Sequence, residues 1–152
     1  MEVKVLYREL WSTLIHDYNI PKGKKFALIK PPKIDEEKEI INYIKGWYDG
    51  EGWIEVMTTK RPYGIYQYPK VGFKIKNKPM RDWILKHLIQ NGIRAKKYDR
   101  KDKSYGISIH GTNACNDFLK KIGFLNPSKI DYLKKLIIEK KGHVSSNQAG
   151  VR

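Results

Sequence analysis

The segment IKGWYDGEG, residues 44–52, holds Glu51 between Gly50 and Gly52. The apolar residues before this segment have helical spacing and the residues after it alternate as in a strand, so Glu51 falls where the chain turns from helix to strand. An acid at such a turn is either a solvated helix end or a group kept for chemistry. Glycines have no side chain, so this pair leaves room for a ligand beside the carboxylate.

The sequence does not support several other kinds of catalytic centre. Its single cysteine, Cys115, cannot form an intramolecular disulfide, and it cannot build a zinc site without partners. The histidines show no HxH or HxxxH spacing, and His110, at the end of an expected strand, is interpreted as polar surface. No GxxxxGK[ST] loop and no nucleophile elbow is present. These patterns disfavour zinc enzymes and hydrolases of the serine or cysteine type.

The cellular compartment is predicted from what the sequence lacks. No apolar run approaches the roughly 18 residues of a membrane span, and the first residues, MEVKVLYREL, do not have the layout of a signal peptide. The single cysteine fits a reducing environment. We therefore expect a cytoplasmic protein, associated with the nucleoid if the host is prokaryotic, with no membrane partner.

Charge is concentrated in one part of the chain. The formal net charge is +15, which favours a polyanionic partner such as nucleic acid. Residues 60–103 hold fourteen Lys and Arg against three acids, whereas residues 35–55 hold seven acids against two lysines. This asymmetry predicts a basic binding face. A basic ribosome-associated protein of unrelated fold is an alternative explanation of the charge.

Hydrophobic periodicity predicts an α+β fold in three parts. Residues 1–34 are expected to form an N-terminal helix and an extended linker, residues 35–141 a core, and residues 142–152 a flexible tail. The core begins with a helix capped by Asp35. Its expected elements are a helix from about 36 to the glycine turn, strands at 53–61 and 70–76 joined by a turn at 61–69, a helix at 78–92, a second hairpin at 93–111 with its turn at 100–104, and helices at 113–123 and 127–141.

Together, the motif and this order of elements resemble the LAGLIDADG homing endonucleases that carry a single motif. Ile44 stands for the leading Leu and Gly46 for the first Gly, while Lys45 departs from the small Ala. The resemblance covers about residues 36–141. It implies an αββαββα core with a four-stranded antiparallel DNA-binding sheet, to which this chain adds an N-terminal helical extension.

In this family two motif helices pack side by side, so one copy of the motif implies a homodimer. Gly46 and Gly50 would let the helix backbones approach closely, and Asp49 would bond backbone at the end of the partner helix. Glu51, with Gly50 beside it, would hold Mg²⁺ together with its two-fold mate, because this cation prefers oxygen ligands. The metal would activate water for attack on a phosphodiester.

The resemblance also implies groups that position water and offset charge. An amide and an Arg near the end of the second strand correspond to Asn77 and Arg81, and a Lys near the final helix corresponds to Lys129. Lys120 or Lys121 could take the place of Lys129.

Sequence recognition would fall to residues that point outward from the strands, because a β-ribbon can enter the major groove. In the strand at 70–76 the lysines alternate with apolar residues. In the third strand the sequence does not decide which alternate residues face DNA. Glu55 puts an acid on this face, where it could accept from a cytosine amino group or repel phosphate. The expected DNA-binding residues are Met57, Thr59, Arg61, Tyr68, Lys70, Lys74, Lys76, Lys97, Arg100 and Ser108.

The predicted function is a site-specific double-strand break in a long, roughly palindromic DNA site, made by a Mg²⁺-dependent homodimer that is encoded within an intron. The alternative on the same scaffold is a non-cleaving RNA maturase, with intron RNA as partner, or a DNA-binding regulator. Glu51 separates the two, because a carboxylate that faces phosphates benefits a nuclease and gives nothing to a pure binder.

Overall fold

The computed structural model describes residue 13 and residues 29–150. The predicted N-terminal helix and most of the linker after it therefore lie outside the described residues. The elements are α2 (Glu37–Glu51), β1 (Gly52–Arg61), β2 (Gly64–Ile75), α3 (Lys78–Gln90), β3 (Lys96–Asp99), β4 (Tyr105–His110), α4 (Thr112–Lys121) and α5 (Pro127–Gly150).

The strands form one antiparallel sheet in the order β1-β2-β4-β3. The two hairpins are thus joined through their later strands, with Gly52 opposite Phe73 and Phe73 opposite Ile107. The predicted α+β class, its four-stranded antiparallel sheet and its order of core helices and strands are confirmed.

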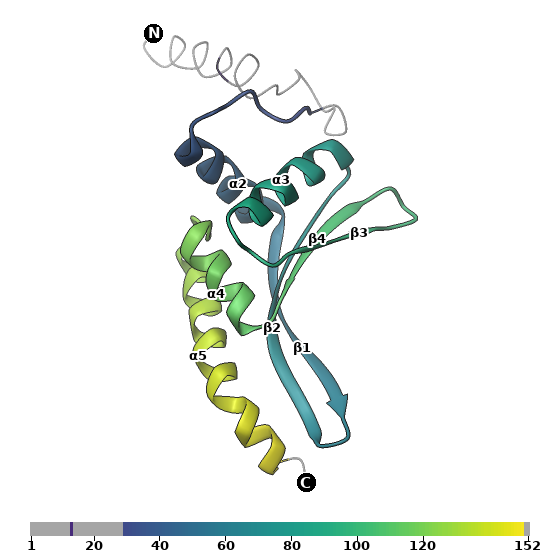
Figure 1. Ribbon diagram of the computed structural model, residues 1–152, viewed down its shortest axis with the longest axis vertical. Coiled ribbons are helices and arrows are strands. Elements are labelled where there is room, and N and C mark those ends of the chain that lie inside the picture. Colours follow the sequence, from purple (N-terminus) through teal and green to yellow (C-terminus); the bar gives the residue numbers. More distant parts are fainter. Residues whose placement is uncertain (1–12, 14–28, 151–152) are drawn as a thin grey trace.

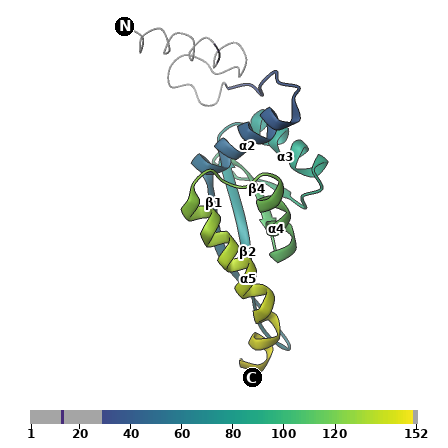
Figure 2. The same cartoon turned by 90° about the vertical axis from the view of Figure 1, so that its left-hand side faces the viewer.

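The helices cover one face of the sheet and leave the other face bare. In Figure 1 α4 and α5 lie to the left of the strands, and Figure 2, seen from that side, has them in front of the sheet. Alternation explains the choice of face, because Val71, Phe73 and Ile75 of β2 are buried against the helices. The core between the two layers also includes Ile40, Ile44 and Tyr48 from α2, Met80, Ile84 and Leu88 from α3, Phe118 from α4 and Leu133 from α5.

Some boundaries differ from the sequence prediction. The segment expected to be a turn at 61–69 is mostly strand, because β2 starts at Gly64, and Tyr66 and Tyr68 pair with Thr59 and Met57 of β1. Aromatic and β-branched residues favour extended structure, and only the two residues at 62–63 make the turn. The first hairpin is therefore long and reaches below the body of the sheet in Figure 1.

Two helix ends also differ. Glu36, not Asp35, occupies the N-cap of α2, and its side chain makes no capping hydrogen bond. Helix α5 was expected to end at about residue 141, but it continues to Gly150, so most of the predicted tail is helical.

Candidate active site and nucleic-acid interface

Glu51 is the last residue of α2, and its side chain is exposed. The next residue, Gly52, starts β1 and donates its N–H to the carbonyl of Tyr48. A Cβ at Gly52 would lie 2.5 Å from that carbonyl oxygen, whereas a Cβ at Gly50 would meet nothing within 4 Å. Gly52 is therefore required by the tight turn itself, and Gly50 leaves open space beside the carboxylate.

The first turn of α5 fixes this corner of the chain. The ammonium of Lys129 donates to the carbonyl oxygens of Asp49 at 2.7 Å and of Gly52 at 3.0 Å, on either side of Glu51. Oδ1 of Asp49 accepts from the backbone N–H groups of Leu125 at 3.0 Å and Asn126 at 2.7 Å. Two charged side chains thus tie the end of α2 to the start of α5.

These contacts bear on the candidate lysines and on Asp49. Lys129 lies beside the Glu51 turn, while the ammonium of Lys121 donates to the carbonyl of Asn91 at the end of α3, and Lys120 is exposed on α4. Asp49 was predicted to bond the partner's helix, but its Oδ1 is occupied by amides of its own chain. This contact within the chain could not be predicted from sequence patterns, because Leu125 and Asn126 are more than seventy residues from Asp49.

The donor atoms at this corner fit Mg²⁺ in type but not in number. A carboxylate is a hard oxygen ligand of the kind this cation prefers. The carbonyls of Asp49 and Gly52 already accept from Lys129. Within the described residues, no group of three or more His, Cys, Asp or Glu side chains is clustered so that it could hold a metal. At this corner the described part of one chain thus offers one exposed carboxylate, Glu51, with the backbone of Gly50 beside it, and a complete site needs further ligands, such as those of a second chain.

Asn77 is built into the body of the protein. It is 2% exposed. Its Oδ1 caps α3 by accepting from the N–H of Met80 at 3.0 Å, and its Nδ2 donates to the carbonyl of Ile29 at 2.6 Å. These contacts assign Asn77 a structural role at the start of α3.

Arg81 is fully buried under the other half of the sheet. Its guanidinium donates to the carbonyls of Tyr98 at 2.9 Å and Gly106 at 3.1 Å, and it pairs with Asp99 at 2.7 Å and Asp82 at 2.8 Å. Gly106 belongs to β4, which β2 separates from β1, so this network lies about 10 Å or more across the sheet from Glu51. The structure therefore does not bring Arg81 to the carboxylate.

Strand register defines the uncovered side of the sheet, which we call the open face. Directly opposite residues share a face, so the pairs Glu55–Lys70, Met57–Tyr68 and Thr59–Tyr66 lie on it together, as do Lys74 and Ser108. Ser108 is only 8% exposed and so offers little surface. The open face carries these predicted DNA-binding residues: Met57, Thr59, Arg61, Tyr68, Lys70, Lys74 and Ser108.

Three predicted contacts fall off the open face. Lys97 pairs with Ile107 and so belongs to the helix-covered side, whereas Lys96 pairs with Ser108 on the open face. The short strand β3, KKYD, has no alternation of apolar and polar residues, so its sequence could not show which residues face the helices. Lys76 is exposed one residue after β2 ends, and Arg100 lies in the turn between β3 and β4.

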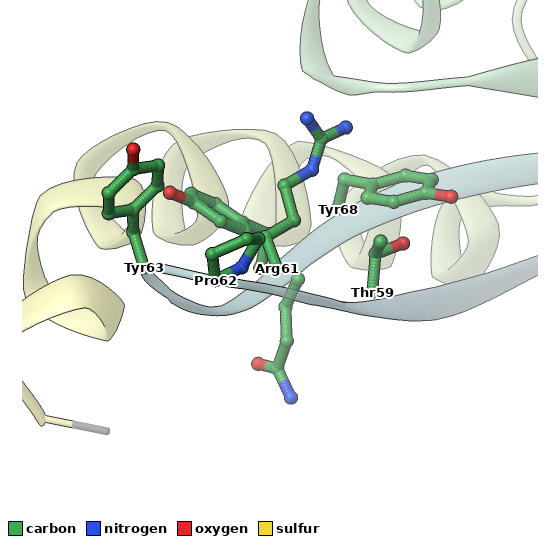
Figure 3. Close-up of a pocket in the computed structure, with 7 residues that line it drawn as sticks. Thr59, Arg61, Pro62, Tyr63 and Tyr68 are labelled. Carbon is green, nitrogen blue, oxygen red and sulfur yellow. The ribbon is translucent and has the colours of Figure 1, made fainter. Parts of the chain in front are cut away.

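The tip of the first hairpin holds an aromatic hollow that the sequence prediction missed. Figure 3 shows Arg61, Tyr63 and Tyr68 around it, with Thr59 and Pro62. The guanidinium of Arg61 lies 5.6 Å from the centroid of the Tyr66 ring, and Tyr63 is 73% exposed. Tyr63 and Tyr66 lie in the segment expected to be a turn, from which only Arg61 and Tyr68 were predicted to contact DNA. An arginine among tyrosines can bind sugars and bases by stacking.

An ion pair crosses the middle of the open face. Lys70 and Glu55 are 2.8 Å apart, with side chains 16% and 41% exposed. The hydrogen bond from Lys70 holds the pKa of the Glu55 carboxyl below its usual value. Glu55 therefore stays ionised and is balanced by a neighbouring cation, so it does not add an unpaired negative charge to the face.

Comparisons with known proteins show which solved structures share this fold. No protein-family model matches the chain, and no curated relative matches it. Among solved structures, the DNA complex of the archaeal intron-encoded homing endonuclease I-Vdi141I is 18% identical with a TM-score of 0.56, over 75% of this chain and 77% of that one. The homing endonuclease I-TnaI is 15% identical with a TM-score of 0.54, over 76% and 81%.

The class that these likenesses define is the LAGLIDADG homing endonuclease fold, and this chain has that fold. A LAGLIDADG endonuclease in complex with its DNA target, I-GzeII, matches 71% of this chain and 39% of its own, at a TM-score of 0.50. In the part of the chain that the structure describes, no helix is long and apolar enough to cross a membrane.

Proposed function

We propose that the protein is a Mg²⁺-dependent endonuclease of the single-motif LAGLIDADG type, which makes a site-specific double-strand break in duplex DNA as a homodimer. The observation that carries this proposal is the exposed Glu51 at the end of α2, directly before β1, with Lys129 bound to the backbone carbonyls on both sides of it. The DNA complexes among the structural neighbours support the choice of partner.

The residues divide the work as follows. Glu51 and its two-fold mate would hold the cation, and a bound Mg²⁺ lowers the pKa of its water and stabilises the leaving oxygen. Lys129 keeps the turn fixed and places a positive charge beside the carboxylate. Lysines of the open face would bind phosphates and set the register of the duplex. We assign Asn77 and Arg81 a positioning role: they would hold α3 and the second hairpin in place. Each side chain is buried and hydrogen-bonded to groups of its own chain.

The proposed dimer uses the exposed face of α2. A Cβ built on Gly46 or Gly50 meets nothing within 4 Å, which is the space that a second helix would need. The I-SmaMI chain, of which only 41% matches this fold, has length for a second unit of the same kind. A chain with one such unit would reach the same arrangement by pairing with a copy of itself.

The burial of Asn77 and Arg81 favours a second candidate function. If neither reaches the reacting phosphate, the centre retains only Glu51 and Lys129, and the scaffold would act as a non-cleaving RNA maturase or a DNA-binding regulator. Binding to duplex DNA or to structured intron RNA, without cleavage, is the property expected of that alternative.

A cleavage screen separates the two functions. Wild type and Glu51→Gln are each mixed with host genomic DNA and a randomised duplex pool in Mg²⁺, and new ends are sequenced. We expect recurrent ends with a common overhang from the wild type alone. Glu39→Gln is the matched control, because it removes an exposed acid from the other end of the same helix and should cut normally. Retention of duplex DNA or RNA without new ends would support the binder.

A further inference from the structure

Three polar side chains of different chemistry lie in one row across the open face. Glu55 of β1 is directly opposite Lys70 of β2, and Lys70 is directly opposite His110 of β4. Lys70 Nζ and Glu55 Oε1 are 2.8 Å apart. The imidazole of His110 lies 6.0 Å from the ring of Tyr68, which neighbours Lys70 on β2. We call these residues the Glu55–Lys70–His110 row.

The charge states in the row are set by its neighbours. Burial, Lys70 and Lys96 lower the pKa of His110, against an opposing effect of Glu55. At neutral pH His110 is therefore uncharged and keeps one N–H donor. The ionised Glu55 offers only acceptors and the ammonium of Lys70 only donors. Read from β1 to β4, the row presents an acceptor, a donor and a donor.

A cytosine–guanine pair presents the complementary order in the major groove. Read from cytosine to guanine, its edge offers the N4 donor, the O6 acceptor and the N7 acceptor. N4 and O6 are joined by a base-pairing hydrogen bond of about 2.9 Å. The tips of Glu55 and Lys70 have nearly the same separation, so the two groups can meet these two atoms together.

We propose that the Glu55–Lys70–His110 row reads one C·G pair in each half of the DNA site. Glu55 accepts from cytosine N4, Lys70 donates to guanine O6, and His110 donates to guanine N7. The inference rests on the proposed binding of duplex DNA and adds a specificity determinant, His110, that the sequence reading treated as plain surface.

The ion pair does not need to break for this contact. A carboxylate has a second oxygen and further lone pairs, and an ammonium has three donors. The pair is therefore a preformed reader, and its groups lose little freedom on binding. A thymine on the β4 side would also offer an acceptor, O4, to Lys70, but it places a methyl group where guanine has N7. His110 is thus the residue that selects guanine over thymine.

The test is selection of bound duplexes from a randomised pool, without divalent cations so that nothing is cut. We expect the wild type to enrich G at the position in question by about tenfold over the other bases. The double variant Glu55→Lys with Lys70→Glu keeps the net charge and the ion pair but reverses donor and acceptor. It should prefer A at the same position, because adenine offers N6 as donor and keeps N7. His110→Ala should accept G and T alike.

Lys74→Gln is the control, because it removes a cation from the same strand and face outside the row. It should weaken binding without changing the base chosen at this position. The inference is overturned if the swapped variant still prefers G, or if the row variants weaken all sequences equally and only reduce the salt dependence, as phosphate contacts would. If no variant, including wild type, enriches any duplex, the proposed function itself fails.

Discussion

At the scale of single residues, charge holds the turn that carries Glu51. Helix α2 has no basic residue in its last turn, so the negative end of its dipole is uncompensated within the helix. Lys129 supplies the missing cation from α5, over the face of Phe124 at 5.5 Å. A cation at a helix C-terminus is stabilising. The same ammonium fixes the backbone on both sides of the carboxylate.

Replacing Lys129 by Met keeps most of the side chain and removes the ammonium. The carbonyls of Asp49 and Gly52 then lose their donor, and we expect the free energy of unfolding to fall by about 1–3 kcal/mol. Urea denaturation followed by circular dichroism measures this change. Glu51→Gln, at an exposed position, should stay within about 0.5 kcal/mol of wild type. Equal midpoints for wild type and Lys129→Met would show that the two contacts add nothing to stability.

The side chain of Tyr48, including its hydroxyl, is fully buried. Its ring packs 4.9 Å from Phe73 and 4.7 Å from Phe118, and among the described residues the buried hydroxyl finds no hydrogen-bond partner. Tyr48→Phe should therefore raise the free energy of unfolding by about 1 kcal/mol, visible as a higher Tm. Tyr63→Phe, at an exposed ring, is the control and should change nothing. A lower Tm for Tyr48→Phe would reveal a bridging water.

At the scale of elements, patterning within one strand or helix was predictable from the sequence and contacts between distant elements were not. The alternation at 70–76 placed Val71, Phe73 and Ile75 on the core side, and the glycine turn after the motif helix was also predicted. The roles of Asn77 and Arg81 depend on Ile29 and on the second hairpin. Such partners are fixed by packing, which no local period reveals. The long first hairpin was missed because Gly64 was interpreted as part of a turn.

Arg81 joins α3 to the second hairpin, and its loss should loosen both. Arg81→Leu leaves the carbonyls of Tyr98 and Gly106 without a donor, and we expect the free energy of unfolding to fall by about 2–4 kcal/mol. Hydrogen exchange should show faster opening of β3 and β4 than of β1. The matched control is Arg94→Leu, at an exposed position before β3. Uniform exchange in all strands would contradict the assignment of Arg81 to the second hairpin.

The same network predicts a difference at acid pH. A hydrogen bond from Arg81 lowers the pKa of Asp99 in the folded protein. Stability from this pair is therefore present above the unfolded pKa of about 3.9 and is lost as pH falls through the lower folded value. Wild type should lose stability below about pH 4 more steeply than Arg81→Leu. Parallel stability curves for the two proteins would show that the Arg81–Asp99 pair does not couple to folding.

At the scale of the whole molecule, the sheet presents Lys70, Lys74 and Lys96 on the side that the helices leave bare, while α2 presents two uncovered glycines. The first property follows from the net charge of +15 and from strand alternation. The second could be read from the spacing of Gly46 and Gly50. Which residues of β3 lie on the open face could not be predicted from the sequence, because only the pairing of β3 with β4 decides it. The proposed duplex binding and the proposed dimerisation would therefore use separate surfaces of one chain.

Gly46→Leu is expected to test the proposed dimer without damaging the fold. A side chain at Gly46 meets nothing within 4 Å in one chain, and replacing glycine inside a helix favours the helix by about 0.8 kcal/mol. The variant monomer should therefore fold at least as well as wild type, while a leucine between two close helices would force them apart. We expect sedimentation to show a dimer for wild type and a monomer for Gly46→Leu, with an unchanged or higher Tm. Gln90→Leu, which adds the same side chain on the exposed end of α3, should remain dimeric. A dimeric Gly46→Leu protein would mean that α2 is not the interface, and the paired carboxylates proposed for Mg²⁺ would then have no means of meeting.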